Sequence, residues 1–264
     1  MLFRSDEYWD GLESFANIKL KEKTKKDEEI DKISNPTNGS WDCIEFGKYW
    51  QNDTNKDGKV DENDEKEPIK WRVMQKYPVN KVAFLISDKI LDVKPFNKTK
   101  STVWKKSMIR SYLNGYSASE NDDGIDFSGT GKNFMQNAFT KKDQKHLEDR
   151  LLDSDNNPSG DLVHIAAPYF INSSQYGFDG NKSRIAETTD YAKQKAGSDY
   201  VKGTYLTGRT TSEGGKKYHC YITENGEIKN LGCADPDTGK YGGIRAIIAI
   251  DLKKANWTYA GKTN

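Results

Sequence analysis

The residues best suited to chemistry stand close together, in the stretch DTNKDGKVDEND at positions 53–64. Side chains that carry oxygen recur there at alternate positions, and a glycine occupies the sixth position, where the backbone of a calcium loop turns sharply. Ca²⁺ prefers roughly six to eight hard oxygen ligands, which a tight loop can aim at one centre. The predicted ligands are side-chain oxygens and the backbone carbonyl of Lys59: Asp53, Asn55, Asp57, Lys59, Asp61 and Asp64.

The same stretch resembles the calcium loop of dockerin-type domains, which also ends in Asp where an EF-hand loop has Glu. Its surroundings differ, because CIEFGKYW before it and EPIKWRVM after it predict strands, and Pro68 disfavours a helix there. Val60 is the apolar anchor that such loops tuck under themselves. We therefore expect a structural Ca²⁺ that holds the crossing between two strands and does not switch a helix pair. The alternative is an Asp- and Gly-rich turn without metal.

Signals for catalysis are weak in this sequence. It contains three histidines, His146, His164 and His219, and it lacks the motifs of serine hydrolases, zinc proteases and nucleotide-binding loops. His219 precedes Cys220, but neighbouring residues of a strand point to opposite faces, so the two are not expected to form a nucleophile pair. We expect no catalytic residues and leave enzymatic activity open.

Three arginines stand in apolar or turn-rich segments: Arg110, Arg209 and Arg245. They could hold an anionic ligand, but we favour buried arginines that bond to carboxylates and carbonyls. Three tryptophans lie on the apolar faces of their elements and are expected in the core: Trp41, Trp71 and Trp104. Three tyrosines in Gly-rich loops are better candidates for an exposed recognition surface: Tyr176, Tyr205 and Tyr241.

The elements that must position these residues follow from periodicity. Alternation at Ile69, Trp71 and Val73 predicts a half-buried strand, and the apolar run 81–87 predicts a strand buried on both faces. The segment 218–232 predicts a hairpin around Asn225-Gly226, and 243–252 predicts a strand that closes the domain.

Helices are expected between these strands. The segment 101–115 shows a helical apolar face that stops at Asn114-Gly115, and 140–152 starts with Thr140 as N-cap and Asp143 in the capping-box position. A short helix is expected over 188–197. Strands, then about three helices, then strands predict an α+β fold with antiparallel strands and long loops.

Bulk composition limits the classes of function. The chain has 264 residues, of which 34% are hydrophobic and 31% charged, with a net charge of +1, so nothing indicates nucleic-acid binding. No stretch approaches the roughly 20 apolar residues of a membrane span, and the chain does not begin with an export signal. Of the three cysteines, Cys220 and Cys233 flank the predicted hairpin. They form either one disulfide or two inert thiols.

Several segments follow one another in an order typical of a known family: WDCIEFGKYWQ (41–51), the calcium loop (53–64), EPIKWRVM (67–74), FLIS (84–87), WKKSMIRSYLNG (104–115), FMQNAFT (134–140) and GGIRAIIAIDL (242–252). Together they resemble a family of bacterial domains of unknown function from surface or secreted proteins of gut Firmicutes. The chain departs from that pattern at Tyr112, where Trp is usual, and at Ala246, where Pro is usual. The closing strands are also similar to C-type-lectin-like and formylglycine-generating-type domains, which is the fold that the resemblance implies.

These observations predict a helical leader or linker over 1–36, one α+β domain over 37–253 and a tail over 254–264. We expect a monomeric, non-catalytic, calcium-stabilised extracellular or cell-surface domain that binds a glycan or a protein through the loops 116–133, 172–187 and 207–217. An extracellular place fits the loop, because even weak calcium sites are filled there. The alternatives are a secreted hydrolase of extracellular polymer and a structural spacer in a larger surface protein.

Overall fold

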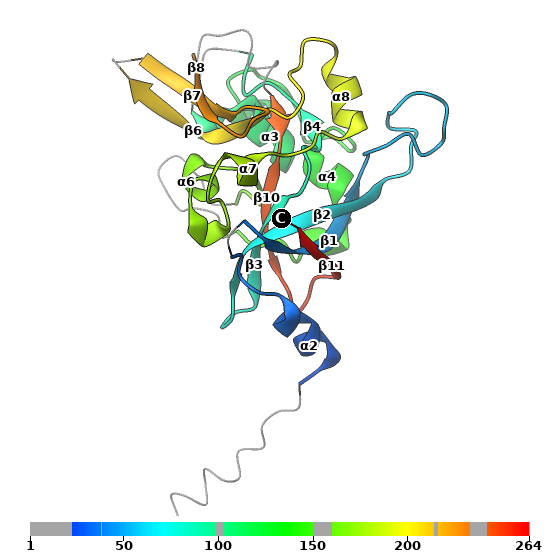
Figure 1. Cartoon of the computed structure of the whole chain (residues 1–264). Helices are drawn as coiled ribbons and strands as arrows, with labels where there is room; N and C mark the ends of the chain where they lie inside the picture. Colours follow the sequence, from blue (N-terminus) through cyan, green and yellow to red (C-terminus); the bar gives the residue numbers. More distant parts are fainter. Residues whose placement is uncertain are drawn as a thin grey trace, which may run out of the picture.

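A six-stranded antiparallel sheet forms the centre of the molecule in the computed structural model (Figure 1). Its strand order is β11 (Thr258–Thr263), β1 (Trp41–Tyr49), β2 (Glu67–Tyr77), β3 (Val82–Ser87), β10 (Ala246–Asp251) and β5 (Val163–Ile165). The structure describes residues 23–37, 39–98, 103–149, 160–213, 216–232 and 242–263. The predicted strands over 69–74 and 81–87 are confirmed as β2 and β3. The predicted strand over 243–252 is confirmed in part: Arg245 divides it into a two-residue strand, 243–244, that belongs to another sheet, and β10.

Two smaller sheets lie beyond one end of the central sheet (Figure 1). One pairs β4 (Asp92–Val93) with β9 (Gly243–Ile244), and the other contains β6 (Tyr205–Glu213), β7 (Lys216–Ile222) and β8 (Ile228–Gly232). The predicted hairpin is confirmed as β7–β8, with Gly226 at φ 77° in its turn. The prediction that 207–217 is a loop is wrong, because most of it belongs to β6 and β7.

Seven α-helices occur in the described part of the chain, not the predicted three or so: α2 (Lys25–Lys32), α3 (Met108–Asn114), α4 (Phe134–Ala138), α5 (Lys141–Gln144), α6 (Pro168–Ile171), α7 (Asn181–Arg184) and α8 (Asp190–Ala196). Most are one or two turns long. Helical periodicity becomes visible only over roughly 11 or more residues, so such helices leave almost no pattern in the sequence. The α+β class with antiparallel sheets is nevertheless confirmed.

Local chemistry explains where the expected helices begin and end. Ser107 caps α3 and divides the segment 101–115 into a 3₁₀ turn, η1 (Trp104–Lys106), and α3, which ends at Gly115 with φ 74°. Thr140 and Asp143 form the predicted capping box of α5. That helix stops early because Leu147 turns inward and pairs with Ile250 of β10.

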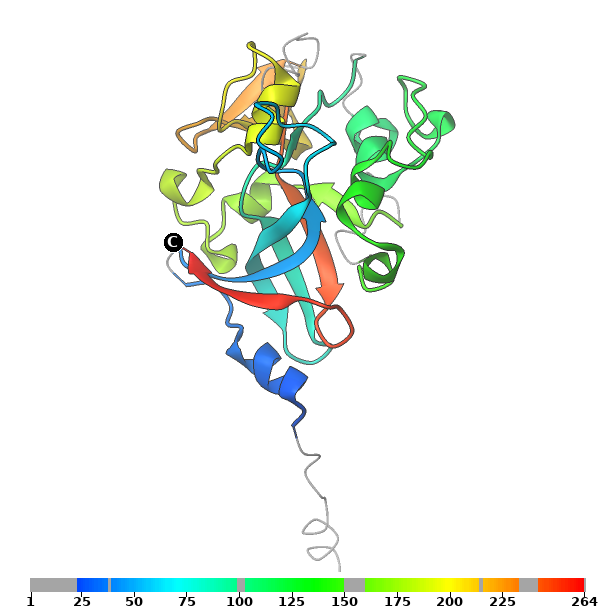
Figure 2. The same ribbon diagram turned by 90° about the vertical axis from the view of Figure 1, so that its right-hand side faces the viewer.

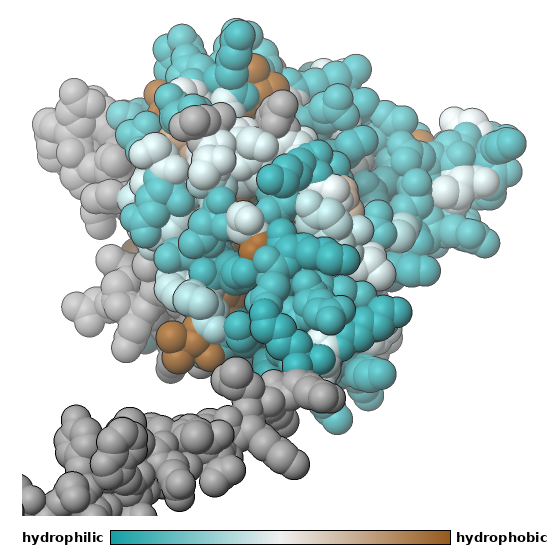
Figure 3. Space-filling model, turned by 60° about the horizontal axis from the view of Figure 1, so that its bottom comes forward, coloured by the Kyte–Doolittle hydropathy of each residue, from teal (hydrophilic) through white to brown (hydrophobic). Residues whose placement is uncertain are grey.

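The central sheet is buried on both faces. Along β3 and β10 alternate side chains enter two separate cores, with Leu85 and Ile248 in one and Ile86 and Ile247 in the other. Figure 2 shows helices on both sides of the sheet: α3 and α4 supply side chains to the first core and α6 to the second. The remaining surface is mostly hydrophilic in the view of Figure 3, as the low hydrophobic content predicts.

Both ends of the described chain pack on this sheet. Ile30 of α2 is fully buried in the first core, and Lys26 lies 3.9 Å above the ring of Trp257. Residues 258–263, expected as a tail, form β11 and pair with β1. Residues 1–22 of the predicted leader lie outside the described residues.

Candidate functional site

The acidic loop connects β1 to β2, as predicted, and projects from the ends of these strands (Figure 1). Its side chains fold back on its own backbone. The Oδ1 atoms of Asn55, Asp57 and Asp61 each accept the N–H two residues further on, at 2.9, 2.8 and 2.8 Å. Asp53 Oδ2 accepts the N–H of Gly58 at 2.9 Å. These bonds hold the backbone of the loop in a series of tight turns, while Asn55, Asp57 and Lys59 remain exposed.

Gly58 is at the position where the loop needs a left-handed backbone, with φ 85°. Nothing lies within 4 Å of a Cβ placed there, so conformation and not space requires glycine.

Among the described residues of the loop, one buried side-chain oxygen has no partner. Asp53 Oδ1 is buried and makes no hydrogen bond, although the other oxygen of the same carboxylate is bonded. A carboxylate oxygen withdrawn from water without a donor is costly, and a cation would remove that cost. The chemistry of this oxygen is therefore compatible with a hard cation such as Ca²⁺.

Asp64 has a second role that the spacing does not predict. Its Oδ1 accepts from the N–H and hydroxyl of Thr54 at 2.7 and 3.0 Å and from the N–H of Asn55 at 3.1 Å, so it latches the end of the loop onto its start. Its Oδ2 accepts one bond, from the N–H of Asp61 at 2.9 Å. These bonds, led by the one from Asp61, lower the pKa of Asp64. Because Oδ1 is saturated, only Oδ2 has a lone pair left for a metal.

Within the described ranges, no group of three or more His, Cys, Asp or Glu side chains converges on a point that could hold a metal. The predicted ligand set is of another kind, since it also uses the amide of Asn55 and the carbonyl of Lys59. Calcium accepts such mixed oxygen ligands. The calcium site therefore remains a prediction.

The loop is docked onto α8. Val60, the expected apolar anchor, packs against the first core, and its N–H donates to Gln194 Oε1 at 2.9 Å. Tyr191 of the same helix donates its hydroxyl to Glu62 Oε1 at 3.3 Å. The order of the loop is thus tied to the position of α8.

Behind that contact lies a buried polar network centred on Asp92, which is fully buried. Its Oδ2 accepts the hydroxyls of Tyr49, at 2.7 Å, and of Tyr112. Lys195 approaches the same oxygen at 3.5 Å and donates to the hydroxyl of Tyr191 at 2.7 Å. Burial, and next the charge of Asp92, raise the pKa of Tyr49 and of Tyr112, which keeps both as hydrogen-bond donors.

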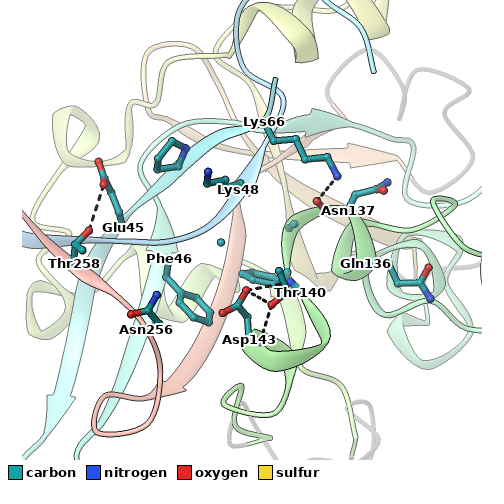
Figure 4. Close-up of a pocket in the computed structure, with 14 residues that line it drawn as sticks. Glu45, Phe46, Lys48, Lys66, Gln136, Asn137, Thr140, Asp143, Asn256 and Thr258 are labelled. Atoms are coloured by element: carbon teal, nitrogen blue, oxygen red, sulfur yellow. Dashed lines mark hydrogen bonds between the residues drawn. The ribbon is translucent and has the colours of Figure 1, made fainter. Parts of the chain in front are cut away.

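A groove of about 420 Å³ opens beside the strand ends that the loop joins (Figure 4). Glu45 and Thr258 lie on one side of it, and Lys66 and Asn137 lie on the other. Its lining residues come from β1, the end of the β1–β2 connection, β2, the region of α4 and α5, the β10–β11 connection and β11: Glu45, Phe46, Gly47, Lys48, Lys66, Pro68, Gln136, Asn137, Ala138, Phe139, Thr140, Asp143, Asn256 and Thr258. An apolar floor with a few convergent polar groups is typical of a ligand site.

Lys66 links the groove to the acidic loop, because it follows the loop by two residues. Its Nζ donates to the carbonyl of Asn137 at 2.7 Å and lies 4.1 Å above the ring of Trp50. Burial lowers its pKa. One wall of the groove is therefore held by the closing end of the loop.

The groove also holds two carboxylates, which are already engaged. Asp143 Oδ2 accepts the N–H and the hydroxyl of Thr140 at 3.1 and 2.6 Å. Glu45 Oε2 accepts the hydroxyl of Thr258 at 3.4 Å. Both act as acceptors in this arrangement, and the described lining includes no His, Cys or Ser.

Two of the three arginines are buried and bond to a carboxylate or a carbonyl, which is the interpretation that we favoured over an anionic ligand. Arg110 Nε lies 2.9 Å from both oxygens of the buried Asp161. Arg245 is fully buried and donates to the carbonyl of Ser87 at 2.9 Å. The side chain of Arg209 lies outside the described part.

The tryptophans are confirmed as core residues: Trp41, Trp71 and Trp104 are 0%, 0% and 5% exposed.

His164 is buried against Trp104, with ring centroids 5.8 Å apart, and burial lowers its pKa. His219 is buried with its ring 4.0 Å from that of Phe96. Cys220 is buried, and a bridge to Cys233 is not tested because Cys233 lies outside the described residues.

The predicted recognition tyrosines are only partly right. Tyr205 is fully buried, and its hydroxyl donates to the carbonyl of Arg184 at 2.8 Å, so the prediction that it is exposed is wrong. Tyr176 is half-buried at the surface, and Tyr241 lies outside the described residues.

The groove was not predicted from the sequence, since it is lined by none of the three loops expected to bind ligand. Its residues come from distant segments and leave no common local pattern.

No protein-family model, no curated protein and no solved structure matches this chain. Among the described helices, none is both long and apolar enough to cross a membrane. The resemblance to bacterial surface domains therefore stays a prediction.

Proposed function

We propose that this protein is a calcium-stabilised, non-catalytic binding domain that acts outside the cell or on its surface and takes a glycan or a protein segment in the groove beside the acidic loop. The observation that carries the proposal is the buried, unpartnered Oδ1 of Asp53 inside a loop with calcium-type spacing. The finer fold assignment, C-type-lectin-like or formylglycine-generating-type, is part of the proposal and is supported by the ordered motifs.

The calcium ion would have a structural role, since it would hold the loop between β1 and β2 in its folded form. It would use Asp53 Oδ1, the second lone pair of Asn55 Oδ1, the Oδ2 atoms of Asp57 and Asp61, the carbonyl of Lys59 and Oδ2 of Asp64. When bound, it supplies positive charge that neutralises the crowded carboxylates. The chain itself already provides the turns, the latch at Asp64 and the docking to α8.

The groove supports a binding function because it combines an apolar floor with side chains of both charges. Phe46 and Phe139 lie in the floor, each 2% exposed, and Lys48 and Glu45 offer opposite charges at the rim. Such a site suits a polar chain that also carries apolar groups, which describes a protein segment or a substituted glycan.

A secreted hydrolase is the second candidate, because Glu45 and Asp143 share the groove. Glycoside hydrolysis needs one carboxylic acid and one carboxylate on either side of the bond. Asp143 is engaged as the cap of α5, so the binding function is preferred.

The calcium part is tested by thermal unfolding of the full chain in EDTA and in millimolar Ca²⁺ or Mg²⁺. Calcium at about 100 times its Kd should raise the Tm by about 5–10 °C, and Asp53→Asn or Asp57→Ala should abolish the effect. Asp126→Asn is the matched control, since Asp126 makes a similar turn with the N–H of Ser128 at 3.0 Å but lies outside the loop. Identical melting curves in EDTA and Ca²⁺ would refute the site.

The groove is tested with an array of glycans and extracellular-matrix proteins. Binding that is lost in Lys66→Ala, without release of product, supports the proposal. Degradation of a polymer that stops in Glu45→Gln establishes the hydrolase instead. A domain that binds nothing on the array and degrades nothing would be a spacer.

A further inference from the structure

Three tyrosines from separate elements meet at the surface on the other side of the central sheet. Tyr77 ends β2, Tyr169 lies in α6, and Tyr176 ends the 3₁₀ turn η3 (Ser174–Tyr176). The ring of Tyr169 is 6.3 Å from that of Tyr176, at 78°. The turn η3 also packs against β2, the strand that Tyr77 ends, which brings Tyr77 to the same side of the molecule. We call Tyr77, Tyr169 and Tyr176 the tyrosine platform.

The platform rests on a rigid base. Phe84 of β3 is 8% exposed and contacts Tyr77, with ring centroids 5.4 Å apart. Phe170 is 6% exposed and lies 4.0 Å from Tyr169 and 5.0 Å from Tyr176. Because both phenylalanines belong to the second core, the tyrosine rings are held from below and keep their places without a ligand.

The upper side of the platform is open to solvent. Tyr77 is 36% exposed and Tyr169 is 41% exposed, and the neighbouring Val79 is 96% exposed. Single exposed apolar residues are common on soluble proteins and require no explanation. Several aromatic rings that gather from distant parts of the chain, in a protein whose surface is otherwise hydrophilic, indicate a contact surface.

The platform is polar but carries no charge of its own. Burial raises the pKa of Tyr77 and of Tyr169, so both stay neutral phenols. The nearby hydroxyl of Tyr176 raises the pKa of each further. Within the described part of the chain, no Asp, Glu, Lys or Arg adds to either shift. The hydroxyl of Tyr77 donates to Gln75 Oε1 at 3.0 Å, which adds an amide to the rim. Nearby Lys76 points away, since its Nζ donates to the carbonyl of Ile30 at 3.0 Å.

We propose that the tyrosine platform binds a neutral carbohydrate. A sugar ring has one face of C–H groups, which stacks on an aromatic ring, and a rim of hydroxyls, which needs uncharged donors and acceptors. Ring faces, phenol hydroxyls and an amide are the groups present. The described neighbour Lys76 is directed away from the platform, so it offers an anionic ligand no ion pair, and a flat hydrophobic partner would leave the hydroxyls unpaired. Tyrosine also orders at small entropic cost, because it has two side-chain torsions.

This site goes beyond the groove and is separate from it. The floor of the groove belongs to the first core and the base of the platform to the second, so the two lie on opposite faces of the sheet. The inference shares with the proposed function only the view that the domain binds rather than transforms its ligand. It needs neither calcium nor Lys66.

The test uses the full chain and neutral oligosaccharides of glucose, xylose, mannose and galactose, with binding followed by titration calorimetry and by the NMR signals of the tyrosine rings. At least one neutral oligosaccharide should bind with a Kd in the micromolar to millimolar range. Tyr169→Ala and Tyr77→Ala should each weaken it by about 10-fold or more, whereas Tyr169→Phe, which keeps the ring, should weaken it by only about 3-fold. EDTA and Lys66→Ala should leave this binding unchanged.

Tyr259→Ala is the matched control, because Tyr259 is also 41% exposed but lies on β11, an edge strand that does not belong to the platform. It should bind the sugar as the wild type does, and the Tm of every variant reports whether the fold is intact. Absence of binding to the whole neutral set at millimolar concentration overturns the proposal, as does binding that survives Tyr169→Ala. Self-association that Tyr169→Ala abolishes would overturn it too, and would assign the platform to a second copy of the chain.

Discussion

The backbone N–H of Val60, in the middle of the acidic loop, donates to the side-chain oxygen of Gln194 on α8, 2.9 Å away and 134 residues further along the chain. This bond joins the loop to the buried network around Asp92, since Tyr191 of the same helix contacts Glu62 on one side and Lys195 on the other. Anything that stabilises the loop should therefore also stabilise the helix and the strands beneath it.

Gln194→Ala should weaken this coupling. The variant leaves the N–H of Val60 without its partner, and we expect a loss of about 1 kcal/mol in the free energy of unfolding together with a smaller rise of the Tm on adding Ca²⁺. Lys193→Ala is the control on the same helix, since it loses only a surface ion pair with Asp190. The idea fails if Gln194→Ala and wild type gain the same stability from calcium.

Asp92→Asn should be strongly destabilising. Asp92 accepts the hydroxyls of two buried tyrosines and faces Lys195, and an amide would lose the charge and present N–H groups to donors. We expect the free energy of unfolding to fall by about 2–4 kcal/mol in urea titrations. Asp190→Asn, whose side chain is 55% exposed, should change it by less than about 0.5 kcal/mol. Equal effects of the two variants would contradict the network.

Gly47→Ala should damage both the fold and the groove. Gly47 has φ 69°, and a Cβ there would lie 2.6 Å from Cε1 of Phe139 and 2.7 Å from the carbonyl oxygen of Ala138. We expect a loss of about 2–4 kcal/mol, the sum of backbone strain and overpacking. Gly261→Ala separates the two causes, because Gly261 has φ 77° with nothing within 4 Å of its Cβ. That variant should lose only about 1 kcal/mol, and a loss as large as that of Gly47→Ala would refute the close approach.

His164 should make stability depend on pH. Burial lowers its pKa from 6.5, so the folded chain binds fewer protons than the unfolded chain just below that pH. Stability should therefore fall as the pH drops below about 6.5. His164→Phe, which keeps a ring against Trp104, should reduce this slope in unfolding titrations between about pH 7 and 5. His146→Gln, at a half-buried position, is the control. A slope that is the same in wild type and His164→Phe would exclude His164 as its source.

Much of the framework could be predicted from local pattern. Alternation in 69–74 is a property of strands themselves, because successive side chains point to opposite faces of the sheet. The capping box of Thr140 and Asp143 and the stop at Gly115 are equally local, since each involves only residues within one turn. The same holds for the acidic loop, whose turns are made by its own side chains.

The short helices, the strand over 207–213 and the pairing of residues 258–263 could not be predicted in this way. A helix of four residues, such as α5, has too few positions to show a period, and β11 is a strand only because the edge of β1 is there to pair with it. Tyr205 also could not be placed from the sequence. Its Gly-rich surroundings predict exposure, but its hydroxyl bonds to Arg184 and Arg245 in the interior.

The sequence by itself therefore determined the α+β class, the main strands and an acidic loop between two of them, because these depend on residues a few positions apart. Only the tertiary structure decided that Val60 bonds to Gln194, that Lys66 bonds to the carbonyl of Asn137 on one side of a groove, and that Asp92 is buried among tyrosines. Those contacts join segments tens of residues apart, and burial, which sets their chemistry, is a property of the packed molecule and not of any single segment.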